Sequence, residues 1–200
     1  MGAPRFDRLV VATGNEGKYR ELSALLPRAL VSEPTFAPEL ARLVVDETGD
    51  GYAENALLKA RAWAEASGLP SLADDSGLEV AALGGAPGLR SARVVPGPDE
   101  ARVRWLLSQL EGESDRRARF VAALALVVPG QWTLICEGGC PGRIAEAPSG
   151  TGGFGYDPVF VPDGYDVSFA ALPGATKMMI SHRAAAVRAM LDVLGHGASA

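Results

Sequence analysis

The apolar positions in the first part of the chain fall into short continuous runs separated by one amphipathic segment. Residues 9–12 form a compact run rich in valine, which predicts a buried strand. Apolar side chains then recur at helical spacing over residues 19–26, and Pro27 ends that pattern. Residues 33–41 contain two prolines and predict irregular surface, while the run 43–45 predicts a second short strand. This region therefore predicts strand, loop, helix and strand.

The middle of the chain carries the clearest helical pattern. Residues 52–67 are rich in alanine, with leucines and a tryptophan at helical spacing, and Gly68 follows where helices commonly end. Residues 78–80 predict a strand, and residues 99–110 predict a further helix with Asp99 as its N-cap. We therefore expect a strand with a helix on either side of it in sequence.

Residues 118–145 change character and predict three antiparallel strands. The first is the long apolar run 118–128, which turns at Pro129-Gly130 into a segment of period two over 131–137. Glycines and a proline then precede a short third strand around Arg143-Ile144. Because no Ser/Gly-rich linker separates this meander from the first half, we expect one integrated domain over residues 1–200, with a cleft.

Composition places the chain among globular proteins. Of its 200 residues 48% are hydrophobic and 22% charged, and no apolar run approaches the roughly 20 residues of a spanning helix. The N-terminus lacks the pattern of a signal peptide, and the two cysteines suit a reducing compartment, so we expect a cytoplasmic protein. No second Cys or His pair stands near Cys136 and Cys140, which we interpret as structural or incidental thiols.

The net charge of −5 argues against a protein that binds duplex nucleic acid, because such proteins carry a basic face. It is compatible with a small polyanion. A triphosphate needs only a few placed cations and backbone N–H groups, and its metal supplies the remaining positive charge.

Two adjacent carboxylates stand in the stretch Asp74-Asp75-Ser76-Gly77, after a short apolar run. One interpretation is a polar turn, since Asp, Ser and Gly dominate turns. The other is a site: neighbouring side chains of an extended chain point to opposite faces, so one carboxylate is held while the other projects at a strand end. A second acidic pair, Asp46-Glu47, follows the strand predicted at 43–45 and favours the site.

Residues 13–18 form a glycine-containing loop between the first strand and the first helix. Such a turn presents helix N-terminal N–H groups to an anion, and Lys18 adds a full charge. It is not a P-loop, because its glycines are too close together and no Ser or Thr follows the lysine. A plain strand-to-helix turn is the alternative. Lys59 shares a helical face with Asn55, and its alternative is a solvated helix lysine.

The stretch 148–160 carries four glycines in six residues with interleaved aromatic side chains. Glycines at this density make sense where the backbone passes close to a ligand. Phe154 and Tyr156 can provide a flat surface for a nucleobase, and Asp157 can accept a hydrogen bond from the edge of the base. The alternative is a glycine-rich hairpin loop whose aromatic side chains fill the core.

Residues 177–183 open the predicted last helix, with Ser181 as its cap. Lys177, His182 and Arg183 gather at this N-terminus, where positive charge opposes the helix dipole. Because that arrangement is unfavourable without an anion or polar ligand, we expect these side chains to face one.

Seven short motifs occur in order along the chain, and each is weak alone. They are Thr13-Gly14-Asn15 with Lys18, Asp46-Glu47-Thr48-Gly49, Glu54-Asn55-Ala56 with Lys59, Ala73-Asp74-Asp75-Ser76-Gly77-Leu78, Gly84-Gly85-Ala86-Pro87-Gly88, Phe154-Gly155-Tyr156-Asp157-Pro158 and Ser181-His182-Arg183. Together they resemble the inosine triphosphate pyrophosphatase family, the noncanonical purine nucleoside triphosphate pyrophosphatases. The resemblance covers nearly the whole chain, from about residue 9 to the last helix.

The resemblance implies an α/β fold with a mixed, elongated central sheet flanked by helices, two lobes with a cleft between them, and a homodimer. It implies Mg²⁺-dependent hydrolysis of ITP, dITP and XTP to the monophosphate and pyrophosphate, which removes these nucleotides from the pool. Asp75 would be the general base and a metal ligand, with Asp46 as the second ligand. The family usually has Glu at the position of Asp46, and Glu47 stands beside it.

The substrate-binding residues that the resemblance implies come from the glycine-containing loop, the long helix and the two C-terminal motifs. They are Thr13, Gly14, Asn15, Glu16, Gly17, Lys18, Lys59, Ser76, Phe154, Gly155, Tyr156, Asp157, Lys177, His182 and Arg183.

Two other functions fit many of the same residues. A nucleotide phosphatase acting on the γ phosphate would release orthophosphate instead of pyrophosphate. A nucleotide-binding sensor without turnover would keep the Lys18 loop and the Phe154 pocket, but it would not need Asp75 together with Asp46-Glu47. The acidic residues therefore favour an enzyme.

Overall fold

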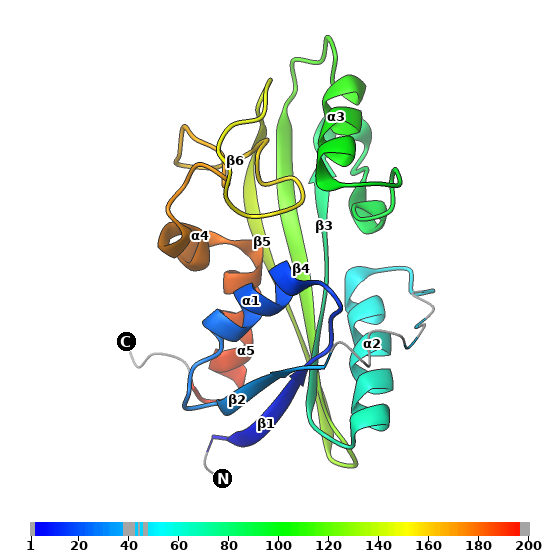
Figure 1. Ribbon diagram of the computed structural model, residues 1–200, viewed down its shortest axis with the longest axis vertical. Helices are drawn as coiled ribbons and strands as arrows, with labels where there is room; N and C mark the ends of the chain where they lie inside the picture. Colours follow the sequence, from blue (N-terminus) through cyan, green and yellow to red (C-terminus); the bar gives the residue numbers. More distant parts are fainter. Residues whose placement is uncertain (1–2, 38–42, 44, 46–47, 197–200) are drawn as a thin grey trace. The chain divides into compact units, whose positions relative to one another are not determined.

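The structure is a computed structural model that describes residues 3–37, 43, 45 and 48–196. Its main elements are β1 (Phe6–Val11), α1 (Glu16–Leu25), β2 (Val31–Phe36), α2 (Tyr52–Ser67), β3 (Ser71–Val80), α3 (Asp99–Gln109), β4 (Arg117–Val128), β5 (Trp132–Ile144), β6 (Phe160–Pro162), α4 (Gly174–Ile180) and α5 (His182–Val193). Within these residues the strands form one sheet in the order β2-β1-β3-β4-β5-β6 (Figure 1). β1 pairs in parallel with β2 and β3, whereas β6 is antiparallel to β5. The predicted α/β class with a mixed sheet is confirmed.

Contacts group the chain into two compact units. Unit 1 comprises Met1–Asp75, Ala122–Gly138 and Arg183–Ala200, and unit 2 comprises Ser76–Val121 and Gly139–His182. The strands β3, β4 and β5 contribute residues to both units. The single domain and the cleft expected from the sequence stay predictions.

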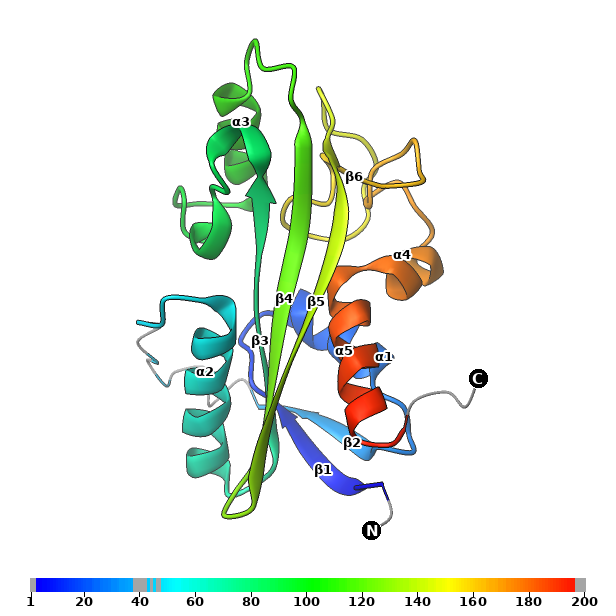
Figure 2. The same cartoon turned by 180° about the vertical axis from the view of Figure 1, so that it is seen from behind.

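In unit 1, helices cover both faces of the sheet, with α2 on one face and α1 and α5 on the other (Figures 1 and 2). Successive residues of a strand point to opposite faces of the sheet, so the side chains of β4 contact helices on both faces. Ala123 and Ala125 pack with Ala60 and Trp63 of α2, forming one buried cluster. The even-numbered residues of the same strand join a second cluster that includes side chains of α1 and α5: Ala122, Leu124 and Leu126.

The same alternation governs β3. Leu72 lies in the cluster with α1 and α5, and Ala73 lies in the cluster with α2. The next two residues, Asp74 and Asp75, continue this alternation inside the strand. They are therefore neither in a turn nor at a strand end, and both of those expectations are wrong. The expectation that the two carboxylates face opposite sides is confirmed by their different partners, described below.

In unit 2 a third buried cluster joins the later part of β3 to α3, β4 and β5. Leu78 and Val80 pack with Val103 and Leu106 of α3. Aromatic side chains complete this core, namely Phe120, Tyr156, Phe160 and Phe169. Cys136 and Cys140 are buried in separate clusters as free thiols, and burial raises both pKa values, that of Cys140 to about 11. Both are buried and unpaired with each other, and their interpretation as structural or incidental thiols stays a prediction.

The irregular segment expected at 33–41 is wrong over its first part, because β2 extends from Val31 to Phe36. Pro34 lies inside this strand, opposite Leu9 of β1. Proline cannot donate a ladder hydrogen bond, but among the described strands β2 lies at the edge of the sheet, with β1 as its neighbour. The strand expected at 43–45 is not formed at Leu43 or Val45, and Val44 lies outside the described residues.

The three-stranded meander contains one strand fewer than expected, because β5 continues through the glycines to Ile144. Gly142 is paired with Pro162 of β6. A Cβ atom at Gly142 would lie 2.4 Å from the carbonyl oxygen of Val161, so glycine here permits close strand approach. The glycine that seemed to punctuate the pattern therefore lies inside a paired strand.

Two helix boundaries also differ from the prediction. The N-cap of α3 is Pro98, and Asp99 is the first helical residue. The last helical region is split: α4 ends at Ile180, Ser181 has extended backbone, and α5 begins at His182. Lys177 therefore belongs to a separate short helix. Among the described residues, no helix has the length and apolarity needed to cross a membrane.

Candidate functional site

Asp75 is held by two side chains of α2 within unit 1. The Nζ atom of Lys59 lies 3.1 Å from Oδ1 of Asp75 and also donates to the carbonyl oxygen of Asp74 at 2.8 Å. Asn55 donates from Nδ2 to Oδ2 of Asp75 at 3.4 Å, and its own oxygen accepts from the backbone N–H of Gly49. Lys59 and Asn55 share a helical face as predicted, and the alternative of a solvated lysine is wrong.

Asp74 lies on the other face of β3, in a buried charge cluster. Its Oδ2 atom lies 2.7 Å from Nζ of Lys18 in α1 and accepts hydrogen bonds from Nε and Nη2 of Arg183 in α5 at 3.3 and 3.4 Å. Arg183 also donates from Nη1 to Glu21 at 2.9 Å. Two cations thus meet at one oxygen of Asp74, and Glu21 pairs with the second of them. We call the side chains of Asp74, Asp75, Lys18, Lys59, Arg183 and Glu21 the carboxylate–cation cluster.

Burial and the attraction between opposite charges shift the pKa values of Lys18 and Asp74 in opposite directions. For Lys18, desolvation by burial is the largest effect and lowers its pKa, against the opposing attraction of Asp74. For Asp74, burial raises the pKa, but the charges of Arg183 and Lys18 and the hydrogen bond from Lys18 together lower it well below its ordinary value. The surrounding cations therefore favour the ionised form of Asp74, which in turn stabilises the positive charges beside it.

The loop before α1 is a capped helix N-terminus. Asn15 is the N-cap, and its side chain accepts from the backbone N–H of Lys18 at 3.0 Å, while Thr13 Oγ accepts from the N–H of Asn15. Gly14 is exposed, and Glu16 and Gly17 lie in the first helical turn. First-turn N–H groups lack partners within a helix, so this end of α1 suits an anion.

Residues 148–158, which we call the aromatic loop, belong to unit 2. Asp157 is buried and holds the loop from within: its Oδ2 accepts from the backbone N–H of Phe154 at 2.8 Å and forms an ion pair with Lys177. The Nζ of Lys177 also lies 5.1 Å from the centre of the half-buried Phe154 ring, within cation–π range. Three residues predicted to bind the base, Phe154, Asp157 and Lys177, are therefore in contact.

Tyr156 is placed differently from Phe154. Its ring is part of the unit 2 core, and its hydroxyl donates to the carbonyl oxygen of Ser91 at 2.9 Å. Burial raises its pKa to about 12. The core-filling interpretation therefore applies to Tyr156. Phe154 is half-buried in the loop, and its role as a surface for a nucleobase stays a prediction.

His182 and Ser76 complete the predicted set in unit 2. His182 is buried, and its ring stacks on Phe120 with 4.7 Å between centroids. Ser76 follows Asp75 in β3 and is half-buried. The predicted cationic group at a helix start is thus divided, since Lys177 pairs with Asp157 while Arg183 pairs with Asp74 and Glu21. Internal carboxylates, not a ligand alone, offset those charges.

Sequence reasoning missed Asp99, Arg102 and Glu21. Asp99 Oδ2 accepts from the backbone N–H of Gly155 at 2.5 Å, across 56 residues of sequence, while its other oxygen pairs with Arg102. Glu21 and Arg183 are 162 residues apart. No short motif contains such partners. The one sequence signal for Asp99 was its place as an acidic residue at the start of α3. Acidic residues are common at helix starts, so this signal does not indicate a contact with the aromatic loop.

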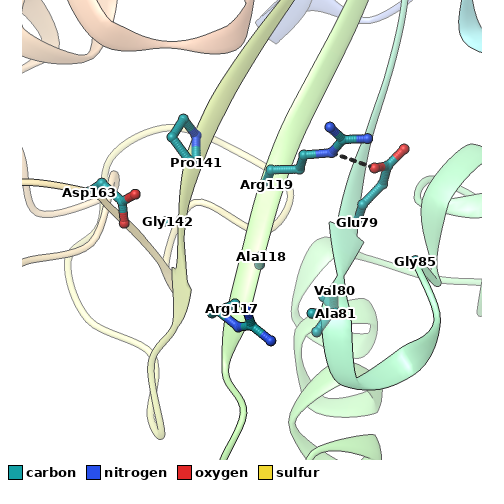
Figure 3. A pocket seen from close by; sticks show the side chains of 10 residues that line it. All are labelled: Glu79, Val80, Ala81, Gly85, Arg117, Ala118, Arg119, Pro141, Gly142 and Asp163. Carbon is teal, nitrogen blue, oxygen red and sulfur yellow. Dashed lines mark hydrogen bonds and ion pairs between the residues drawn. The ribbon is translucent and has the colours of Figure 1, made fainter.

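Two of the hollows in unit 2 differ in character. One, of about 590 Å³, lies between the aromatic loop and the first turns of α3, where Asp99, Glu100 and Arg104 line it. The other, of about 490 Å³, lies over β3, β4 and β5, and Figure 3 shows Arg119 and Glu79 pointing toward one another there. Their Nε and Oε2 atoms are 2.7 Å apart. No residue predicted to bind substrate lines the second hollow.

Within the carboxylate–cation cluster, Asp75 is the residue that would contribute to a magnesium site shared with a phosphate. Mg²⁺ takes oxygen ligands and commonly uses one or two carboxylates together with substrate phosphates. Asp75 offers carboxylate oxygens and is 9% exposed. In the part of the chain that the structure describes, no three His, Cys, Asp or Glu side chains gather as a metal cage. Asp46 and Glu47, the other predicted carboxylates, lie outside the described residues.

Comparison with known proteins agrees with the motifs. Residues 9–193 match the Ham1 family. A protein of Symbiobacterium thermophilum named dITP/XTP pyrophosphatase is 51% identical over 193 residues, 94% of each chain. One of the same name from Aquifex aeolicus is 44% identical over 198 residues, covering 94% of this chain and 96% of its own.

The fold is shared with a solved structure of a HAM1 protein from Coxiella burnetii. Its TM-score is 0.83 at 38% identity, and the match covers 95% of this chain and 99% of that one. Sequence and fold thus agree over nearly the whole chain. The resemblance inferred from seven short motifs is confirmed, and the protein belongs to the Ham1 family.

Proposed function

We propose that the protein is a pyrophosphatase that hydrolyses noncanonical purine nucleoside triphosphates, namely ITP, dITP and XTP, to the monophosphate and pyrophosphate. The observation that carries the proposal is Asp75, a carboxylate fixed inside a strand by Lys59 and Asn55, one residue from the Asp74–Lys18 ion pair. Relatives that are about half identical over nearly their full length carry the name dITP/XTP pyrophosphatase. The chain is accordingly a hydrolase of triphosphate anhydride bonds.

The phosphates would be bound by Lys18 and by the N-terminal N–H groups of α1. Their charges stabilise the negative charge that develops on phosphate oxygens as the anhydride bond breaks. Thr13 and Asn15 fix the backbone there by capping the helix, so these donors are already oriented before substrate arrives. Lys59 would neutralise charge near Asp75.

Asp75 would act as general base. Its carboxylate accepts the proton of a water molecule whose oxygen attacks the α phosphorus, and the bond from that phosphorus to the bridging oxygen breaks as pyrophosphate leaves. Asp75 and Asp46 would hold Mg²⁺, which supplies positive charge to the phosphate oxygens. Asn55 and Lys59 orient Asp75 for this role, since they contact both of its oxygens.

The base would be recognised by the aromatic loop with Lys177, His182 and Arg183 as predicted donors. A 6-oxo purine accepts hydrogen bonds at the position where adenine presents an amino donor. A site made of cationic and backbone donors therefore rejects adenine, because mispaired buried polar groups discriminate strongly. The half-buried ring of Phe154 offers a surface on which a base can stack.

The test is a panel of nucleoside triphosphates with Mg²⁺ and, separately, with a chelator in its place. We expect pyrophosphate from ITP, dITP and XTP, far less from dATP, and none with chelator. Orthophosphate as the first product would support the γ-phosphatase, and nucleotide binding without turnover would support a sensor. A homodimer and a cytoplasmic location also remain proposals, and light scattering on the purified protein tests the first.

A further inference from the structure

The base of the aromatic loop is closed by backbone hydrogen bonds within unit 2. Ser149 N–H donates to the carbonyl oxygen of Pro158 at 2.8 Å, and Gly152 N–H donates to that of Ala170 at 2.9 Å. Between these anchors, Gly153 and Gly155 have φ values of +73° and +65°. Glycine adopts such values readily but also many others, so backbone preference alone does not fix the tip of the loop.

Two carboxylates fix that tip, and they do so at successive residues. Asp157, which belongs to the loop itself, accepts from the N–H of Phe154 at 2.8 Å. Asp99, which belongs to α3, accepts from the N–H of Gly155 at 2.5 Å. Hydrogen bonds to a charged acceptor are the stronger kind. The two peptide units that flank the Cα atom of Phe154 are therefore anchored to different parts of unit 2.

The carboxylate of Asp99 is itself held in place. One of its oxygens pairs with Arg102, one helical turn further along α3, and Arg102 also donates from Nη1 to the carbonyl oxygen of Gly97 at 2.8 Å. This leaves the second oxygen of Asp99 aimed at the loop. The hollow of about 590 Å³ lies between α3 and the loop, so close side-chain packing does not hold the loop to the helix over that area.

We infer that Asp99 is a positioning residue for nucleobase binding, which it governs by anchoring Gly155 and thereby the ring of Phe154. The inference rests on the proposed function, because it concerns the substrate base of that reaction. Asp99 does not touch the phosphates in this scheme. Its loss is expected to affect affinity for the base and to leave the chemical step and pyrophosphate binding unchanged.

The test compares Asp99→Ala and Asp99→Asn with Glu100→Ala and Glu100→Gln. Glu100 is exposed in the same helical turn and lines the same hollow, so its variants match the loss of charge beside the helix N-terminus. We expect Asp99→Ala to raise KM for dITP about tenfold with little change in kcat. Asp99→Asn keeps an acceptor oxygen and is expected to restore most of that loss, and the Glu100 variants are expected to behave as wild type.

Two further measurements separate positioning from general damage. Inhibition by pyrophosphate is expected to be unchanged in Asp99→Ala, whereas exchange of the Gly155 amide hydrogen is expected to accelerate. A fall in kcat together with weaker pyrophosphate inhibition would overturn the inference, as would a KM equal to that of wild type. If wild-type protein released no pyrophosphate from any nucleotide, the proposed function would fail. Unchanged Gly155 exchange in Asp99→Ala would instead refute the anchoring alone.

Discussion

Asp74 and Asp75 are neighbours in β3, yet their carboxylates pair with lysines from different helices on opposite faces of the sheet. Asp74 pairs with Lys18 of α1, and Asp75 pairs with Lys59 of α2. Asp74 is 2% exposed and Asp75 9%, so the second carboxylate is the more accessible to a ligand. This difference underlies the separate roles that we expect of them, a buried counterion and a reactive base.

Replacing Asp75 with Asn should abolish catalysis while leaving nucleotide bound. The amide retains the size of the side chain but cannot take a proton, and loss of a general base lowers rates by about 10²–10⁴-fold. Pyrophosphate release from dITP measures the rate, and calorimetric titration with dITP measures binding. Turnover within tenfold of wild type would rule out the general-base role.

Replacing Asp74 with Asn should instead destabilise the fold. Lys18 and Arg183 would lose the carboxylate oxygen that they share, and breaking a buried ion pair from one side costs about 3–5 kcal/mol. Urea unfolding measures the change. Asp115→Asn removes the carboxylate of an exposed pair with Arg117 and serves as the control, with no measurable change expected. Equal stability of the two variants would contradict a structural role for Asp74.

Acid should weaken the fold through the same residue. Because the pKa of Asp74 is lower in the folded protein than its ordinary value of 3.8, its contribution is fully present above that value. The contribution declines as pH falls below about 4, where the unfolded chain takes up a proton that the folded chain does not. Unfolding free energy measured from pH 6 to pH 3 should therefore fall less steeply for Asp74→Asn than for wild type. Equal slopes of unfolding free energy against pH in wild type and Asp74→Asn would show that other carboxylates dominate the loss of stability in acid.

Truncating Phe154 to Ala should weaken binding of the base specifically. Stacking of a base on an aromatic ring is worth about 1–3 kcal/mol, so KM for dITP should rise about 5- to 150-fold. Phe154→Trp retains a flat ring and is expected to bind far better than the alanine variant. Steady-state kinetics with dITP, alongside inhibition by pyrophosphate, distinguishes loss of the base contact from loss of the phosphate site. Equal KM values for Phe154→Ala and wild type would exclude stacking.

A methyl group at Gly153 should disrupt the aromatic loop. A Cβ atom there would lie 1.9 Å from Oδ2 of Asp157, the oxygen that accepts from Phe154 N–H. Gly164→Ala is the matched control, since Gly164 has a similarly positive φ but nothing within 4 Å of an added Cβ. Gly153→Ala should raise KM for dITP and lower the melting temperature more than Gly164→Ala does. Equal effects of the two variants would indicate backbone strain alone.

The sequence predicted those parts of the fold whose signals are local. The helix over residues 52–67 was predicted with its observed bounds, and Gly68 ends it with a φ of +68°. β2 was missed because Pro34 indicates a break unless the strand is known to lie at an edge. β3 was divided because Asp, Ser and Gly resemble a turn, whereas contacts from α1, α2 and α5 compensate its charges.

The sequence indicated which residues belong to the candidate site, but it did not indicate which of them contact one another. Lys59 was expected to share a face with Asn55, yet its bond to Asp75 depends on how α2 packs on the sheet. The contact between Asp99 and Gly155 lies beyond any local pattern for the same reason. The roles of the individual site residues in binding and catalysis stay predictions until the variants above are measured.

The alternation of β3 also restricts how this part of the protein can change over evolutionary time. A single-residue insertion or deletion between Ser71 and Asp74 would rotate the strand pattern by one position, because side chains alternate with a period of two. Each carboxylate would then point to the opposite face of the sheet, away from the lysine with which it now pairs. Length changes should therefore be confined to the loops on either side, and β3 should diverge by substitution alone.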